Sequence, residues 1–294
     1  MNGLIVTADD FGAAREVNDA VEIAHRDGIL TAASLMVSAP AAGDAVARAK
    51  RLPSLRVGLH LVLVDGRPAL PSAAIPDLVD SDGFFRDDMA RAGAAMFFLP
   101  HVRRQVAAEI AAQFQAFAAT GLPLDHVNAH KHFHLHPTIA SLIVSVGRDF
   151  GLNAARVPLE PVNVLGQIER GTKRAGAAAL TPFAMLLRAQ FRAAGLLVPD
   201  QVFGLHWSGA MTRGRLRGII AQLPDGLSEI YLHPATGAYP GSAEGYRYRD
   251  ELDALMDSQI IEKIKSSGIR CGGFGDFLSA SQSDKLATRS GPIS

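Results

Sequence analysis

The sequence predicts an α/β protein of the (β/α)-barrel class, built from parallel strands. Short apolar runs rich in β-branched residues recur along the 294 residues, and helical patterns lie between them. Strands that alternate with helices form βαβ units and a parallel sheet. About seven or eight such strands fit a closed or nearly closed barrel, distorted or regular, with its site at the C-terminal strand ends. An open doubly wound sheet is the alternative.

Each expected element follows from its local pattern. The expected strands are short apolar stretches, at Gly3–Asp10, Ile29–Ser38, Arg56–Val64, Leu124–His130, Ala154–Glu160, Val202–Ser208, Glu229–Ala235 and Arg270–Leu278. The clearest helices between them have apolar residues at helical spacing, at Glu16–Asp27, Ala41–Arg51, His101–Thr120 and Thr138–Phe150. We expect one domain over residues 1–280. Residues 281–294 are small and polar, and we expect them to form a flexible C-terminal tail.

Composition limits the classes of partner and of site. The 29 Lys and Arg residues equal the 29 Asp and Glu residues, so no basic field is available to recruit nucleic acid. The single cysteine, Cys271, excludes an internal disulfide and a thiolate zinc site. The N-terminus has no basic and apolar leader, so we expect a cytoplasmic protein, with peripheral contact at the inner membrane left open. The sequence also leaves a homodimer open.

Half of the histidines are gathered in one stretch. "HVNAHKHFHLHP" runs from His126 to Pro137 and holds five of the ten histidines. Pro137 marks a helix start, so the histidines occupy a strand end and the turn that follows. On an extended backbone the side chains of His130, His132, His134 and His136 would point to one side. Imidazole is the commonest neutral metal ligand, so some should bind a divalent cation, whereas others could support ligands or contact substrate. Ordinary polar loop residues are the alternative.

Two neighbouring carboxylates end the first expected strand. "TADDFG" places Asp9 and Asp10 there, and at a strand end both can reach the rim in different directions. One could bind a metal while the other acts as a base, and turn formation or helix capping is the alternative. His60 lies in the third expected strand, and His233 ends the strand of "EIYLHPAT" as a candidate proton donor. A lone histidine in an apolar strand is more often a core residue, but two histidines and one carboxylate also make a facial metal site.

These motifs together resemble the YdjC-like carbohydrate deacetylase family. The resemblance rests on "TADDFG", "GLHLVL", "NAHKHFHLHP" and "LHPA" in this order, and it extends over nearly the whole chain. It implies a distorted β/α barrel that removes acetyl groups from amino sugars with one divalent metal ion, zinc or magnesium. It also implies roles for individual residues: Asp10, His60 and His130 as metal ligands, Asp9 as base and His233 as acid. Of the other histidines in the stretch, we expect His132 and His134 to contact substrate or to support the ligands. Lys131 departs from the pattern, which puts the role of that side chain in doubt.

The chain is also similar to members of the family that are associated with hopanoid lipid biosynthesis. This similarity rests on "HVNAHKHFHLHP" and "FGLHWSGAMT". The segment Arg170–Pro199 agrees with it, because it has no acidic residue and many Leu, Phe and Ala, as interfacial segments do. Its five basic residues, expected to face anionic headgroups, are Arg170, Lys173, Arg174, Arg188 and Arg192. Its expected lipid contacts are Phe183, Leu186, Leu187 and Phe191. A helix packed on the barrel is the alternative.

The function that follows is hydrolysis of an N-acetyl group on an amino sugar. The sugar is either free or linked to a lipid. A cation would polarise the amide carbonyl, Asp9 would take a proton from water, and His233 would protonate the amine. A glycosidase is the first alternative, but it needs carboxyl groups about 5–10 Å apart across a sugar, and neighbouring aspartates fit this poorly. A non-catalytic metal- or lipid-binding protein is the second alternative, and it would release no acetate.

Overall fold

The structure is a computed structural model that describes residues 2–169 and 175–278, with side chains from Thr181 onward in the second range. The strands are β1 (Gly3–Phe11), β2 (Ala32–Leu35), β3 (Arg56–Leu61), β4 (Val127–Ala129), β5 (Gln201–Phe203), β6 (Leu227–Leu232) and β7 (Arg270–Cys271). The α-helices are α1 (Arg15–Asp27), α2 (Ala42–Lys50), α3 (Met89–Phe98), α4 (Pro100–Ala119), α5 (Pro137–Gly147), α6 (Val162–Ile168), α7 (Ala175–Ala193), α8 (Arg213–Ala221), α9 (Tyr248–Leu255) and α10 (Ser258–Ser267). Short 3-10 turns include η2 (His130–Leu135).

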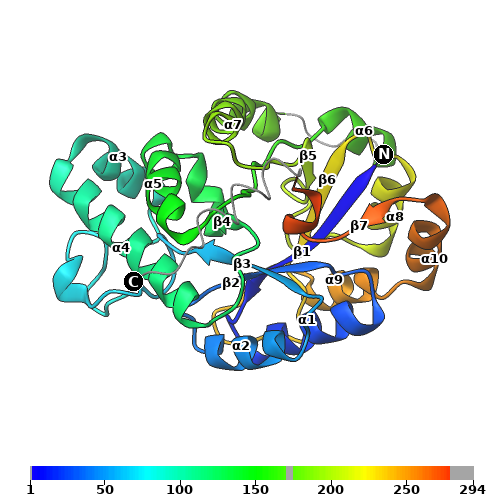
Figure 1. Cartoon of the computed structure of the whole chain (residues 1–294), viewed down its shortest axis with the longest axis horizontal. Coiled ribbons are helices and arrows are strands. Elements are labelled where there is room, and N and C mark those ends of the chain that lie inside the picture. Colours follow the sequence, from blue (N-terminus) through cyan, green and yellow to red (C-terminus); the bar gives the residue numbers. More distant parts are fainter. Residues whose placement is uncertain (1, 170–174, 279–294) are drawn as a thin grey trace, which may run out of the picture.

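The described strands form one parallel sheet that curls into part of a barrel. Their order is β4-β3-β2-β1-β6-β5, and β7 pairs with the first residues of β1. Helices surround this sheet in Figure 1, with α1 and α2 on one side and α7 on the opposite side. The predicted parallel α/β barrel is therefore confirmed in a distorted form. The two end strands of the described sheet, β4 and β5, do not pair with each other, so the barrel is not closed.

The gap in the barrel coincides with a predicted strand that did not form. Over Ala154–Glu160 only isolated bridges are present, from Ala155 to Val127 and from Ala154 to Leu197. Pro158 has no backbone N–H and so cannot donate to a ladder. The chain turns tightly at this proline, and the Leu159 N–H bonds back to the Val157 carbonyl. A single further bond, from the Val202 N–H to the Leu159 carbonyl, links this segment to β5.

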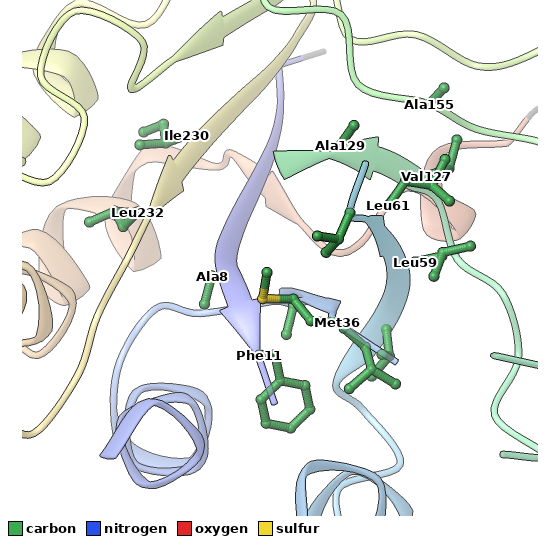
Figure 2. Close-up of a cluster of buried hydrophobic side chains, with 14 of the residues drawn as sticks. Ala8, Phe11, Met36, Leu59, Leu61, Val127, Ala129, Ala155, Ile230 and Leu232 are labelled. Carbon is green, nitrogen blue, oxygen red and sulfur yellow. The ribbon is translucent and has the colours of Figure 1, made fainter. Parts of the chain in front are cut away.

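Side chains alternate between the two faces of the sheet, and the two faces differ in character. The outward face is apolar, and Figure 2 shows part of it: Ala8, Leu59, Leu61, Val127, Ala129, Ile230 and Leu232. The inward face begins with a small apolar floor of Ile5, Ala32, Ala154 and Phe274. Above this floor the barrel interior is polar, with buried Thr7, Asp9, Ser34, His60, Asn128, Arg156 and Glu229. The strands therefore place the helix-packing core outside and the polar groups inside.

Helix α7 contains most of the segment that was expected at a membrane. Leu187 and Phe191 are buried in the core, so the prediction that they contact lipid is wrong. Arg188 and Arg192 form ion pairs with Asp200, whose carboxylate competes with any headgroup. Phe183, Met185 and Leu186 are more than half exposed. Of the other expected headgroup contacts, Arg170, Lys173 and Arg174 lie outside the described residues.

Three predictions about the whole chain are not tested by the structure. The predicted tail at residues 281–294 lies outside the described residues. The single domain over residues 1–280 and the homodimer stay predictions. Within residues 2–169 and 175–278, no helix is both long enough and apolar enough to cross a membrane.

Candidate active site

The two neighbouring aspartates lie at an irregularity near the end of β1. The register between β1 and β2 shifts between Ala8 and Phe11, so Asp9 and Asp10 lie in a bulge-like interruption. Asp10 has a positive φ of 60°, which is uncommon outside glycine. A bulge breaks the strict alternation of a strand and redirects side chains. Both carboxylates can therefore face the barrel interior although the residues are adjacent.

Three predicted metal ligands converge at the carboxyl ends of three strands. The Asp10 Oδ1 atom lies 3.3 Å from the His60 Nε2 atom and 3.3 Å from the His130 Nδ1 atom. The three potential ligand atoms all lie within 4.8 Å of one another. Asp10 is the second-last residue of β1, His60 lies in β3, and His130 follows β4, so residues far apart in sequence meet at one rim. The structure brings this predicted group together.

The hydrogen bond of the His60 ring to Asn128 leaves the Nε2 atom free to bind a cation. The Nδ1 atom is 2.7 Å from the Asn128 Oδ1 atom, and an amide oxygen only accepts, so Nδ1 carries the proton of the neutral ring. The Nε2 lone pair then faces the Asp10 carboxylate, and neither atom has a hydrogen-bond partner among the described residues. Two buried lone pairs that face each other are unfavourable without a positive charge between them, which either a proton on His60 or a metal ion supplies. These residues fit a divalent cation.

The formal charges of the interior agree with this. Asp9, Asp10 and Glu229 are buried carboxylates, and Arg156 is the buried cation among them. Arg156 pairs with both Asp9 and Glu229, whereas no described Lys or Arg forms an ion pair with Asp10. Buried charges are normally paired or bound to metals, so a divalent cation would supply the missing partner of Asp10.

Asp9 is held differently from Asp10. Arg156 donates from Nη1 to the Asp9 Oδ2 atom at 2.5 Å and from Nη2 to the Oδ1 atom at 3.0 Å. The same guanidinium donates to Glu229 at 2.7 and 2.9 Å and lies over the Tyr231 ring. Burial opposes ionisation of Asp9, but the Arg156 charge outweighs it and holds the pKa of this carboxyl well below its usual range. Asp9 is therefore ionised at neutral pH.

The histidine stretch does not follow the extended geometry expected from the sequence. Residues His130–Leu135 form the 3-10 turn η2, and within it Lys131 and His132 have φ values of 52° and 53°. A left-handed turn breaks the alternation, so the histidines do not share one side. The Lys131 Nζ atom forms an ion pair with the Asp65 Oδ2 atom at 2.5 Å. All four described non-glycine residues with positive φ, namely Asp10, Asp65, Lys131 and His132, line one cavity.

The later histidines of the stretch occupy three different environments. The His132 Nε2 atom is 2.8 Å from the Tyr231 hydroxyl, and His132 lines the cavity. His134 is 1% exposed and lies with its ring edge-on to His132. Burial, assisted by the Arg156 charge, lowers the pKa of His134 to about 3, so this ring is neutral. His136 packs edge-on to Phe97 at the start of α5, away from the group of ligands.

His233 follows β6 on the other side of the cavity. Its backbone N–H donates to the Glu251 Oε2 atom at 2.5 Å, and its ring lies edge-on to Tyr246 with centroids 5.2 Å apart. Its Nδ1 atom is buried without a partner among the described residues. The ring is therefore fixed at the cavity wall with an uncommitted nitrogen.

These groups open into one cavity of about 850 Å³. Its inner wall contains Asp9, Asp10, His60, His130, His132 and His233. Aromatic side chains on the outer part include Phe84, Tyr239, Tyr246 and Tyr248. This volume is within the range of small-molecule sites, and aromatic walls with a few polar groups are typical of them.

Sequence reasoning missed several residues that shape the site. Arg156 occupies an inward position of the fifth expected strand, where a charged residue between Ala155 and Val157 was a signal of a buried partner. Asn128 stands two residues before His130, inside the histidine stretch itself, and bonds both His60 and Asp9. Lys131 and Asp65 had no signal, because their meeting depends on the left-handed turn.

Comparisons with known proteins agree with this geometry. A carbohydrate deacetylase of Geobacillus stearothermophilus is 29% identical over 278 residues, which cover 93% of this chain and 97% of the relative. A carbohydrate deacetylase of Brevibacillus brevis is 37% identical over 167 residues, which cover 57% of this chain and only 62% of the relative. The crystal structure of an Enterococcus faecalis V583 protein, named for a proposed role in cellobiose-phosphate cleavage, matches with a TM-score of 0.74 at 22% identity. That match covers 95% of this chain and 100% of the other, and it shows a shared fold.

A family model described as YdjC-like protein matches residues 3–266, from β1 into α10. The match includes all the residues that line the cavity. The chain therefore belongs to the YdjC-like family.

Proposed function

We propose that the chain is a metal-dependent carbohydrate deacetylase that hydrolyses the N-acetyl group of an amino sugar. The observation that carries this proposal is the group of Asp10, His60 and His130, whose potential ligand atoms lie within 4.8 Å of one another in the wall of the cavity, with Asp10 Oδ1 and His60 Nε2 buried and unpartnered among the described residues. The names of the Geobacillus and Brevibacillus relatives support the reaction class. A glycosidase would leave this group of histidines without a role.

Three side chains would hold the cation: Asp10 through Oδ1, His60 through Nε2 and His130 through Nδ1. When bound there, a divalent cation supplies polarisation of the amide carbonyl and a lower pKa for a water molecule at the site. Two imidazoles and one carboxylate leave coordination positions for water and substrate. The two imidazoles favour zinc over magnesium, which prefers oxygen ligands.

Asp9 would act as the base. Its Oδ1 atom accepts from Asn128 and Arg156, whereas its Oδ2 atom accepts from Arg156 alone. Each carboxylate oxygen has two lone pairs, so Oδ2 keeps one for a water proton. The bidentate bond from Arg156 keeps this carboxylate ionised and fixes its direction.

His233 would act as the acid toward the leaving amine. Its ring lies in the cavity wall, and its Nδ1 atom has no partner among the described residues. The Tyr246 ring beside it limits its rotation. A base and an acid on different strand ends can act on opposite sides of the amide carbon.

The finer substrate assignment is a lipid-linked amino sugar, with a glycosylated hopanoid as the expected lipid. Two groups of exposed apolar side chains support contact with a lipid. Phe97, Phe98 and Leu99, where α3 meets α4, are 48%, 73% and 42% exposed. Phe183, Met185 and Leu186 on α7 are 53%, 59% and 59% exposed. Both groups suit peripheral contact with a membrane, and a soluble protein that uses them to bind another protein is the competing explanation.

The experiment is an acetate-release assay on N-acetylglucosaminyl substrates with and without a lipid tail, after metal stripping and metal add-back. Acetate release that disappears on stripping and returns with metal is the expected result. Release of free sugar without acetate would indicate a glycosidase, and metal binding without any product would indicate a non-catalytic protein. Equal kcat/KM on lipid-linked and free sugars, with no binding to anionic liposomes at low salt, would discard the lipid substrate alone.

A further inference from the structure

A chain of hydrogen-bonded side chains crosses the barrel interior from the candidate metal centre toward the opposite end. His60 Nδ1 lies 2.7 Å from Asn128 Oδ1, and Asn128 Nδ2 lies 2.8 Å from Ser34 Oγ. Ser34 Oγ then lies 3.1 Å from His126 Nε2, and His126 Nδ1 lies 2.9 Å from Asp125 Oδ2. The proposed reaction makes no use of Ser34, His126 or Asp125.

The middle of this chain is completely enclosed. Ser34, His126 and Asn128 are each 0% exposed, so substrate cannot touch Ser34 or His126. A buried polar group is costly unless it is hydrogen-bonded, and apolar side chains of similar size would fill the same space at no such cost. A purely structural interior therefore has no need of this set.

One end of the chain is fixed by Asp9. The Asp9 carboxylate only accepts, so the Asn128 group that lies 3.1 Å from its Oδ1 atom must be the NH2. The amide oxygen of Asn128 is then turned toward His60 and must accept the Nδ1 proton. This bond leaves the Nε2 lone pair of His60 directed at Asp10, as a metal ligand requires.

The other end is fixed by Asp125. Its two oxygens accept from the backbone N–H groups of Phe274 and Gly275, at 3.0 and 2.8 Å, which anchor the carboxylate. His126 must therefore donate to Asp125 through Nδ1, and its Nε2 atom accepts from the Ser34 hydroxyl. Every donor in the chain then points away from the candidate metal centre toward one carboxylate, and aligned bonds of this kind strengthen one another.

The His126 ring is held in place from both sides. It stacks on Phe274 with centroids 4.2 Å apart and an angle of 21° between the rings. On the other side, a Cβ atom at Gly58 would lie only 2.5 Å from the ring. Glycine at this position in β3 therefore makes room for the histidine. The hydrogen-bonded chain Asp125–His126–Ser34–Asn128–His60, called the relay below, thus has a fixed geometry.

We propose that Asp125, His126 and Ser34 are positioning residues that act on the metal centre through the Asn128 amide. They hold Asn128 in the one orientation that keeps the proton of His60 on Nδ1 and bonds Asp9. Groups that hydrogen-bond a ligating histidine fix its tautomer and raise its basicity, and their loss costs about 10- to 100-fold in metal affinity. The proposal deepens the proposed function, because it rests on a cation bound by His60.

The test compares two buried serines on parallel strands. Ser34→Ala removes the middle of the chain, whereas Ser228→Ala is the matched control, because Ser228 is 1% exposed and bonds Gln201 on the outer face of the sheet. Ser34→Cys fills the same space without a strong donor and replaces Ser34→Ala if that variant does not fold. Zinc dissociation constants are measured on metal-free protein by competition with a chromophoric chelator.

The expected result is a loss of zinc affinity of about 10- to 100-fold for the Ser34 variants, and a change within about twofold for Ser228→Ala. In zinc-loaded protein labelled with 15N-histidine, the Nδ1 proton of His60 should shift and exchange faster in the Ser34 variants only. A merely structural role would lower thermal stability in both serine variants and leave zinc affinity and this proton unchanged.

The outcomes separate the relay from the deacetylase. Equal zinc affinities in the Ser34 and Ser228 variants would overturn the relay alone. Zinc binding with the expected Ser34 effect, but no acetate release, would overturn the proposed reaction and support the relay. A parent protein that binds no zinc or other divalent cation would overturn both.

Discussion

Asp9 and Asp10 are neighbours in sequence but have different partners. Asp10 faces two imidazoles, whereas Asp9 faces a guanidinium and an amide. The register shift in β1 makes this possible, because both side chains can turn inward. Identical side chains can therefore take the roles of ligand and base within one strand end.

Asp9→Asn tests the base. The amide keeps the shape but cannot accept a proton, so kcat should fall by about 100- to 10,000-fold while zinc content stays close to one per chain. Removing one partner of a buried ion pair should also lower the free energy of unfolding by about 3–5 kcal/mol. Glu229→Gln is the matched control, because it removes the other carboxylate on Arg156 without touching the cavity wall. A similar loss of kcat in both variants would remove Asp9 from the role of base.

At this scale the sequence predicted which ligands meet but not what holds them. The family resemblance implied Asp10, His60 and His130 as the ligands, and the shared rim of strand ends in a parallel barrel predicted that they would lie close together. The same logic could not orient His132 or Lys131, since a left-handed turn follows from packing rather than from residue pattern. Arg156 stands in a short apolar run, which indicates a buried partner, but the sequence does not show that the partners are Asp9 and Glu229.

Three buried glutamates fix the loops at the rim of the barrel. Glu109 on α4 accepts from the backbone N–H groups of Ala69 and Leu70. Glu160 accepts from those of residues 204–206. Glu251 on α9 accepts from Met211 and His233. Burial raises the pKa of each of these carboxyls, which shows how closely the loops cover them.

Glu251→Gln should affect catalysis more than Glu160→Gln. Glutamine has one acceptor oxygen, so one backbone N–H loses its partner in either variant, at about 1–3 kcal/mol of stability. Only Glu251 bonds the backbone of His233, so only its substitution should displace the proposed acid and lower kcat. Urea unfolding and steady-state kinetics measure the two effects. Equal losses of kcat in the two variants would show that the Glu251 bond to His233 has no special effect on catalysis, and would contradict the role given to Glu251.

Sequence reasoning could not identify these anchors, again for a physical reason. Glu251 lies in "YRDELDAL", where acidic residues at helical spacing normally face solvent. The strand elements were easier, since six of the eight expected runs overlap a strand of at least three residues. The fifth run failed at Pro158, a signal visible in the sequence, and the eighth shrank to the two residues of β7.

Acidification should destabilise the whole molecule through its buried neutral histidines. The pKa of His134 falls from about 6.5 in an unfolded chain to about 3 in the folded protein, because burial and the Arg156 charge disfavour the proton. Between these values the unfolded chain binds a proton that the native state does not, so stability falls as the pH falls from about 6.5 toward 3. Glu160 and Glu251, with raised pKa values, act in the opposite direction.

His134→Gln isolates this contribution. Urea midpoints of the parent and of the variant are measured between pH 7 and pH 4.5 without metal. The parent should lose more stability than the variant over this range, because glutamine does not titrate. His101→Gln is the control, since His101 is an exposed histidine, with a side chain that is 52% exposed. Identical pH slopes for the parent and His134→Gln would contradict the buried neutral ring.

The proposed cation should affect the stability of the whole molecule. Asp10 is buried and forms no ion pair with a described Lys or Arg, so a divalent cation bound there should stabilise the fold as well as the chemistry. A ligand that binds only the native state adds about 2.7 kcal/mol when its free concentration is 100 times its dissociation constant. Zinc should therefore raise Tm by several degrees, and a chelator should reverse the rise.

The matched pair for this prediction is Asp10→Asn and Asp65→Asn. Both carboxylates line the cavity, but Asp65 pairs with Lys131 and is not one of the three candidate ligands. Asp10→Asn should lose the shift in Tm, and Asp65→Asn should keep it. Magnesium at equal concentration should give a smaller shift, because imidazole ligands suit zinc. A shift that survives in Asp10→Asn, or one that both variants lose equally, would place the stabilising cation elsewhere.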